Sequence, residues 1–147
     1  PSFVSVTYGA GGTTRDRTLA TVARIAGETS LKPAAHLTCV GASKDEVNSV
    51  IREFRDAGVK HIVALRGDPP GGVGTRFVPH PDGYRNAADL VRGIREIGDF
   101  EVSVSAYPER HPESVSIEED LALMAYKADH GATRARGAVT AGRSTAA

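Results

Sequence analysis

The sequence predicts an α/β protein built on a parallel sheet, and three observations support this prediction. Four strand-like segments alternate with four helix-like segments, which is the order expected of βαβ units. The strand-like segments begin roughly 30 to 40 residues apart, which is the size of one such unit. The third of them, residues 61–65, is a short and almost wholly apolar run, typical of a strand buried on both faces.

The first part of the chain is predicted to contain two strands and the helix between them. Residues 3–7 read as the first strand, and the glycines of residues 9–12 form a turn after it. A helix is expected over 15–27, because apolar residues recur there at helical spacing. Residues 34–39 form the second strand.

The next helix has clear start and stop signals. Ser43 and Glu46 match a capping box, in which each residue's side chain binds the other's backbone N–H. Gly58 is placed to end this helix. The third strand then runs from His61 to Leu65.

A long loop separates the third strand from the last predicted elements. Residues 66–84 hold five glycines and four prolines, so we expect no regular structure there. A loop of this length inside a compact domain is usually functional or disordered. A helix is expected over 86–97, a fourth strand over 100–106, and a final helix from Ser116 to about Asp129.

Composition and charge exclude several classes of protein. Eighteen basic residues balance eighteen acidic ones, so no net field favours nucleic acid or a membrane surface. No apolar run is long enough to span a membrane. The single cysteine, Cys39, rules out an internal disulfide and is typical of a cytoplasmic protein.

Polar residues gather at the predicted carboxyl ends of the strands, where parallel α/β proteins build their sites. Taken singly, each residue also has a structural interpretation: a histidine can be part of the core, a tyrosine can serve in packing, and Arg66 and Asp68 can form a structural ion pair. Together they favour a functional site. They are Thr7, Tyr8, His36, Thr38, Arg66, Asp68, Tyr107, Glu109 and His111.

Other motifs are weaker. The glycines at 9–12 would form a dinucleotide fingerprint only if Thr14 were glycine, and residues 67–72 lack the lysine and hydroxyl of a phosphate-binding loop. The five histidines show no metal-ligand spacing, so no metal site is expected. We expect Cys39 to be buried rather than nucleophilic.

Four strings containing these strand-end residues resemble bacterial methylenetetrahydrofolate reductases. The strings are FVSVTYGA (3–10), AHLTC (35–39), HIVALRGD (61–68) and VSAYPE (104–109), the last followed by His111 and Pro112. The likeness runs in order from Phe3 to about Ala135. Their combination is specific to this family.

The resemblance implies a TIM (βα)₈ barrel with FAD at its C-terminal rim. In that family NADH or NADPH reduces the flavin, which passes hydride to methylenetetrahydrofolate and yields methyltetrahydrofolate for methionine synthesis. Complete members of the family are expected to be homo-oligomers. A whole barrel takes about 250 residues, so we expect a partial barrel of about four βα units over 1–135, with residues 3–7 and 103–107 as exposed sheet edges.

By motif match, the resemblance implies a set of flavin contacts and one catalytic residue. Asp68 would also face the folate, where its charge disfavours the reduced flavin anion and stabilises the cationic iminium that receives hydride. Arg66 and Lys127 suit the pyrophosphate. The implied FAD contacts are Thr7, Tyr8, His36, Arg66, Gly67, Asp68, Ala87, Tyr107, His111, Asp120 and Lys127.

The chain also departs from the family pattern. The general-acid glutamate would lie before Pro1, which predicts an interior fragment that binds FAD weakly and cannot turn over folate. Residues 136–147 are expected to be disordered or the product of a frameshift. Asn86 and Tyr126 replace a tyrosine and an arginine found in other members. Two alternatives stay open: a non-functional pseudogene remnant, and a nucleotide-binding α/β domain without catalysis.

Overall fold

The computed structural model describes residues 3–7, 15–69, 71, 76–106 and 116–137. Strands and helices alternate throughout this part of the chain. The strands are β1 (Phe3–Val6), β2 (Lys32–Thr38), β3 (His61–Leu65), β4 (Glu101–Ala106) and β5 (Arg134–Gly137). The helices are α1 (Arg15–Glu28), α2 (Lys44–Asp56), α3 (Ala87–Ile97) and α4 (Ile117–Asp129).

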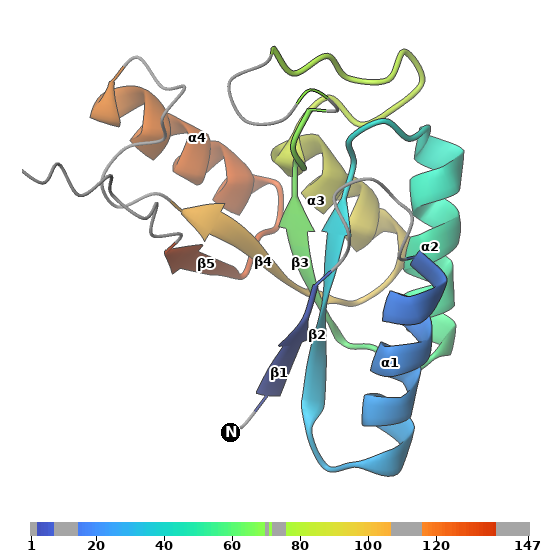
Figure 1. The fold of residues 1–147 in the computed structure, drawn as a ribbon. Helices are drawn as coiled ribbons and strands as arrows, with labels where there is room; N and C mark the ends of the chain where they lie inside the picture. Colours follow the sequence, from blue (N-terminus) through green and yellow to red (C-terminus); the bar gives the residue numbers. More distant parts are fainter. Residues whose placement is uncertain (1–2, 8–14, 70, 72–75, 107–115, 138–147) are drawn as a thin grey trace, which may run out of the picture.

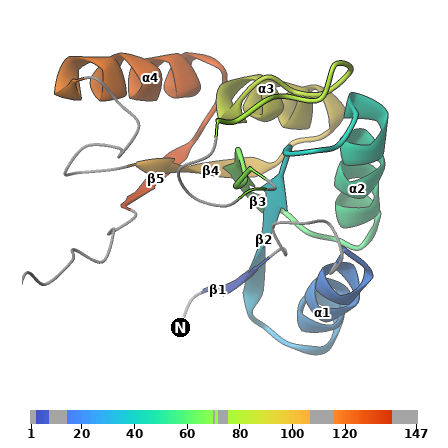
Figure 2. The same ribbon diagram turned by 45° about the horizontal axis from the view of Figure 1, so that its top comes forward.

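The five strands form one parallel sheet in the order β1-β2-β3-β4-β5, so each strand pairs with its neighbour in the chain. The sheet curls, and all four helices lie on its outer side (Figures 1 and 2). The predicted α/β class and parallel sheet are therefore confirmed. A curled single-layer sheet with helices on one side is compatible with part of a (βα)₈ barrel.

The core lies between the outer face of the sheet and the helices. Alternate residues of β2, β3 and β4 point to this side, because side chains along a strand alternate between its faces. They pack against the apolar stripes of α2 and α3, and the residues involved are almost fully buried. The sheet contributes Ala35, Leu37, Ile62, Ala64, Val102 and Val104, and the helices contribute Val47, Val50, Ile51, Phe54, Leu90, Val91 and Ile94.

The inner, concave face of the sheet is unusually polar for a barrel, whose interior is normally filled with branched apolar side chains. His61 Nε2 lies 2.7 Å from Ser103 Oγ on the neighbouring strand, and both residues are buried. His36 Nε2 lies 2.5 Å from Ser5 Oγ across β1 and β2. Histidine–serine pairs thus satisfy polar groups on this face.

The start of α2 agrees with the capping box predicted from the sequence, and side-chain caps also begin α3 and α4. Ser43 caps α2 with a complete capping box, in which its backbone N–H donates to Glu46 Oε2 at 2.8 Å. Asn86 caps α3 by accepting from Asp89 N at 2.9 Å. Ser116 caps α4. These caps satisfy N–H groups that a helix start would otherwise leave unpaired.

The structure corrects two predictions near the end of the chain. Residues 134–137 form β5, so the boundary expected at Ala135 falls inside a strand, and residues 138–147 lie outside the described part. Because β5 pairs with β4, residues 103–106 are not a sheet edge. The strand is held by tertiary contacts: Thr133 N donates to Val102 O at 2.8 Å, and Arg134 pairs with Glu101 at 3.1 Å.

β2 begins at Lys32, two residues earlier than predicted. Pro33 lies inside this strand and has no N–H to donate to a neighbouring strand. It sits near the strand's start, where a proline is best tolerated. Within the described residues, no helix is long and apolar enough to cross a bilayer.

The buried pair of His61 and Ser103 predicts a pH-dependent stability. Burial lowers the pKa of His61 from 6.5, and Arg134 and Arg136 lower it further while Glu101 opposes them. The unfolded chain then binds more protons than the folded one below about pH 6.5. Folding stability should be fully present above this pH and decline as the pH falls toward the folded-state pKa.

We expect denaturant unfolding between pH 8 and pH 5 to show this decline, and His61→Asn to flatten it. The pKa of His36 is also lowered, chiefly by burial, so a double variant with His36→Asn should be flatter still. His80→Gln, in the loop before α3, serves as the control. An equal slope in the wild-type chain and in both variants would contradict the prediction.

Candidate functional site

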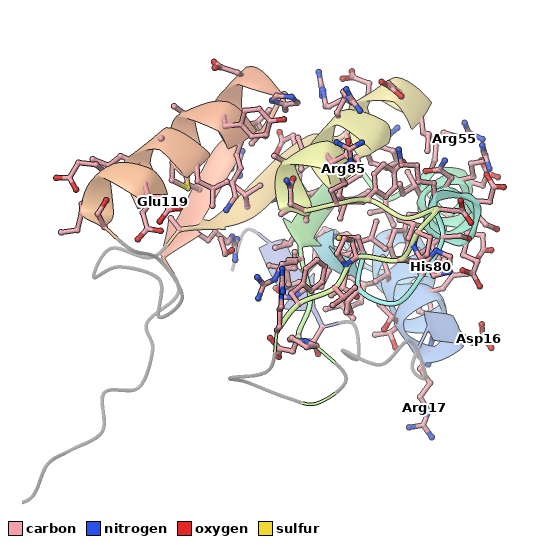
Figure 3. The ribbon with its side chains drawn as sticks, turned by 90° about the horizontal axis from the view of Figure 1, so that it is seen from above. Asp16, Arg17, Arg55, His80, Arg85 and Glu119 are labelled. Atoms are coloured by element: carbon pink, nitrogen blue, oxygen red, sulfur yellow. The ribbon has the colours of Figure 1, made fainter. Side chains whose placement is uncertain are left out.

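The carboxyl ends of the five parallel strands lie along one edge of the curled sheet; in Figure 1 the arrows of β1, β2 and β3 point upward and those of β4 and β5 point to the left. Figure 3 looks down on this edge, with His80 and Arg85 labelled on the β3–α3 loop and Glu119 in the first turn of α4. The predicted site residues of the first and third strands follow this arrangement. Thr7 succeeds β1, and residues 66–68 succeed β3.

The turn at Arg66-Gly67-Asp68 is closely packed against the residues that end β2. Gly67 has a φ of +87°, a conformation that side chains disfavour. A Cβ there would lie 2.5 Å from Val40 Cγ1 and 3.1 Å from Thr38 Cβ, so the backbone presses against the end of β2. The turn therefore directs Arg66 and the exposed Asp68 from one rigid point.

Arg66 lies against an aromatic ring. Its guanidinium carbon is 4.7 Å from the centroid of Phe77, which belongs to the β3–α3 loop. The Arg66 carbonyl also accepts a long hydrogen bond from Cys39 Sγ at 3.5 Å. Sequence reasoning missed Phe77; the signal was an aromatic residue set among the loop's glycines and prolines.

His36 lies within β2 rather than beyond its carboxyl end. It stands two residues before the end of β2 and points to the concave face, where it pairs with Ser5. Burial, and then the charge of Arg136, lower the pKa of His36, so its neutral form is favoured. Neither Ser5 nor Arg136 was identified from the sequence.

Lys127 and Asp120 share one face of α4, two helical turns apart. Lys127 is only 6% exposed, and its Nζ donates to Ser105 O near the end of β4 at 3.1 Å. Burial lowers the pKa of Lys127, and Asp120 partly opposes that effect. The helix therefore brings a cation to the strand-end edge. Because an ammonium has three donors, the bond to Ser105 leaves it the capacity to bind an anion.

Ala87 is the first residue of α3 and is buried. Backbone N–H groups at a helix start carry a partial positive charge. The Asn86 side chain already binds the N–H of Asp89. The predicted contact at Ala87 would thus be to a helix start rather than to a side chain.

The long loop before α3 is anchored to α2. Lys44 N donates to Asp82 O at 2.9 Å, and Tyr84 donates from its hydroxyl to Asn48 Oδ1 at 2.6 Å. A Cβ on Gly93 would overlap the Tyr84 ring. The absence of a side chain at Gly93 therefore makes room for the tyrosine. Residues 76–86 contain no helix or strand, as predicted, yet they are held in place.

Three predicted contacts, Tyr8, Tyr107 and His111, lie outside the described residues, as does Glu109. Cys39 is buried, and burial raises its pKa to about 11, which disfavours the thiolate that a nucleophile needs. Among the described residues, no three His, Cys, Asp or Glu side chains are grouped as a metal site would require.

Comparison with known proteins identifies what the chain resembles. A family profile described as methylenetetrahydrofolate reductase matches residues 1–137. The chain is 48% identical over 135 residues to the 5,10-methylenetetrahydrofolate reductase of Salmonella typhimurium, and 47% to that of Escherichia coli. It is 37% identical to a Zea mays protein named methylenetetrahydrofolate reductase (NADH) 1.

These alignments cover much more of this chain than of its relatives. The bacterial alignments include 92% of the chain but 43% of each relative, and the maize alignment includes 88% of the chain and 22% of the relative. The chain thus spans less than half the length of the curated proteins that it matches.

Solved structures support the fold alone. A putative phosphonomutase from Burkholderia cenocepacia superimposes with a TM-score of 0.67 at 15% identity, covering 92% of this chain and 60% of that one. An oxaloacetate acetylhydrolase superimposes with a TM-score of 0.65 at 14% identity, covering 96% of this chain and 52% of that one. At such identities the similarity carries no functional conclusion.

The packing of Gly67 yields a prediction with a matched control. Gly67→Ala should lower the free energy of unfolding by the strain of a positive φ, about 1–2 kcal/mol, and by a further overpacking cost of about 1–3 kcal/mol. Gly41→Ala shares a positive φ of +67° but has no atom within 4 Å of the new Cβ, so only the strain applies.

Adding Val40→Ala to Gly67→Ala should recover part of the overpacking cost, since Val40 Cγ1 is the closest atom to the new Cβ. Denaturant unfolding of the wild-type chain and the three variants measures each step. Equal losses in the two glycine variants, with no recovery in the double variant, would show that the close approach is unimportant.

Proposed function

The chain belongs to the methylenetetrahydrofolate reductase family, and on this basis we propose that its strand-end edge binds FAD for the reduction of methylenetetrahydrofolate to methyltetrahydrofolate. A nicotinamide cofactor, NADH or NADPH, is the proposed source of electrons. Because the relatives are more than twice as long, this is a proposal about the reaction that these residues serve. The cytoplasmic location expected from the sequence is part of it.

The turn at residues 66–68 is the observation that carries the proposal. It places a guanidinium and a carboxylate on either side of a glycine whose backbone is closely packed. A flavin dinucleotide needs both functions: cationic donors for its pyrophosphate, and control of charge near its ring. One rigid turn at the end of the central strand supplies them together.

The donor set fits the chemistry of FAD. Arg66 can bind a phosphate through two N–H groups at once, and the Lys127 ammonium stands near the end of β4, the strand beside β3 on the same edge. Two cations match the two negative charges of a pyrophosphate. Neutral His36 on the concave face offers a ring nitrogen for hydrogen bonding.

The remaining proposed contacts are Thr7, Gly67, Ala87 and Asp120, together with Tyr8, Tyr107 and His111. Thr7 is fixed through its carbonyl, which accepts from Thr18 Oγ1 of α1 at 3.1 Å. Ala87 would present the N-terminus of α3, which favours a negative group. When bound, FAD would accept electrons from the nicotinamide and deliver hydride to the folate.

Asp68 has the proposed catalytic role. Its side chain is exposed at the end of β3, so it can face a bound substrate. A carboxylate there stabilises a positive charge that develops on the folate as its iminium forms. The same charge disfavours added negative charge on a neighbouring flavin.

Binding of FAD to the 147-residue chain tests the proposal. We expect saturable binding, weakened about 10- to 100-fold by Arg66→Met because a charge-assisted hydrogen bond is lost. The affinity of Arg66→Lys for FAD should lie between those of the wild-type chain and Arg66→Met, since lysine keeps the charge but not the bidentate geometry. Quenching of flavin fluorescence measures each dissociation constant.

Arg24→Met is the control for this experiment, because Arg24 is exposed on α1 and pairs with Glu28. It should bind FAD as the wild-type chain does. Failure of the wild-type chain to bind FAD, or equal losses in the Arg24 and Arg66 variants, would count against the proposed site.

Asp68→Asn should raise the reduction potential of bound FAD. Removing a negative charge near the flavin favours the electron-rich reduced form, and a rise of about 30 mV corresponds to about 1.4 kcal/mol for two electrons. Asp56→Asn is the control, because Asp56 ends α2 at the opposite edge of the sheet. Spectroscopic titration with a reference dye measures both, and an unchanged potential in Asp68→Asn would refute its proximity to the flavin.

A further inference from the structure

Phe77 lies against the strand-end turn, and the proposed site gives it no role. Its ring lies 4.7 Å from the guanidinium carbon of Arg66, within the range of a cation–π contact. Both side chains are half-buried, so the contact is partly shielded from water. The two residues are not neighbours in the chain, which means that only the folded loop brings them together.

The backbone of Arg66 is already fixed, but its side chain is long. The carbonyl accepts from Cys39 Sγ, and the following residue, Gly67, is packed against Val40. Beyond that fixed point, an arginine side chain loses much of its rotamer entropy when it is ordered. If an aromatic ring already holds the guanidinium before a ligand binds, less side-chain entropy is lost in the binding step.

The loop that carries Phe77 is itself secured. Asp82 O accepts from Lys44 N at the start of α2, and Gly83 N donates to His80 O at 2.9 Å in a turn. Gly83 also packs closely against the Ala42 carbonyl, where a Cβ would lie 2.6 Å from the oxygen. The ring of Phe77 is therefore presented from an anchored segment.

We propose that Phe77 is a positioning residue, which holds the Arg66 guanidinium in place to receive a diphosphate group. The ring contacts the face of the guanidinium, whereas a phosphate is bound by the N–H groups at its edge. The two interactions are thus compatible and can occur together. The inference rests on the proposed function, in which that diphosphate belongs to FAD, and adds a residue that the family resemblance does not assign.

A double-mutant cycle on FAD binding tests the inference. Phe77→Leu should weaken FAD binding about three- to tenfold, the range that a partly desolvated cation–π contact supports. Phe77→Tyr keeps the ring and should bind FAD as the wild-type chain does. In an Arg66→Met background, Phe77→Leu should have no further effect, because no guanidinium remains to be positioned.

Val78→Ala is the matched control, since Val78 is the next residue of the loop and is 71% exposed. It should leave FAD binding unchanged. If Phe77 had a merely structural role, Phe77→Leu would weaken binding by the same factor with and without the Arg66 guanidinium, and that result would overturn the inference. Equal losses in Phe77→Tyr and Phe77→Leu would also overturn it.

The two proposals fail in different ways. If the wild-type chain does not bind FAD, the proposed function fails and this inference fails with it. If the wild-type chain binds FAD and Arg66→Met weakens it, but Phe77→Leu binds normally, only the role of Phe77 is refuted. Thermal unfolding of each variant establishes that the compared proteins are equally folded.

Discussion

The central strand β3 pairs in parallel with β2 on one side and β4 on the other, and this pairing determines the arrangement of the sheet and of its strand-end edge. Ile62 and Ala64 face the helices and are fully buried, while His61 and Val63 are buried on the concave face. Because all five strands run in one direction, their carboxyl ends meet at one edge. The turn after β3 therefore emerges at the centre of that edge, between the ends of β2 and β4, and a ligand bound there meets residues 66–68 together.

The two faces of the sheet contribute differently to the fold. The outer face supplies apolar burial against α2 and α3, which is the main driving force for folding. The concave face carries polar side chains, and these are stable in a sheet only when they are hydrogen-bonded. The pairs His61–Ser103 and Ser5–His36 meet that condition. Burial of the His61 ring and partial burial of the His36 ring lower both histidine pKa values, so this face ties the stability of the fold to pH.

The strand-end edge combines fixed backbone with long side chains. Gly67 brings the turn against β2, and the anchored loop returns Phe77 to the guanidinium of Arg66. Lys127 reaches the edge from a helix on the outer side, and burial lowers the pKa of its ammonium group. The proposed FAD site would therefore be organised before its ligand arrives, which lowers the entropy lost on binding.

Local sequence signals were enough to predict the helices and the first four strands. The strings that resemble the reductase family were enough to pick out the residues at the strand ends. The apolar run of β3 matched the prediction at both ends, and Ser43 and Asn86 cap helices because their side chains accept from the first turn. Other features depend on tertiary contacts. The residues of β5 have no apolar pattern and become a strand because β4 offers unpaired backbone groups to bind. Phe77 contacts Arg66, and Arg136 lowers the pKa of His36, although the members of each pair are separated in the sequence. No local pattern predicts these interactions, because they form only when the chain is folded.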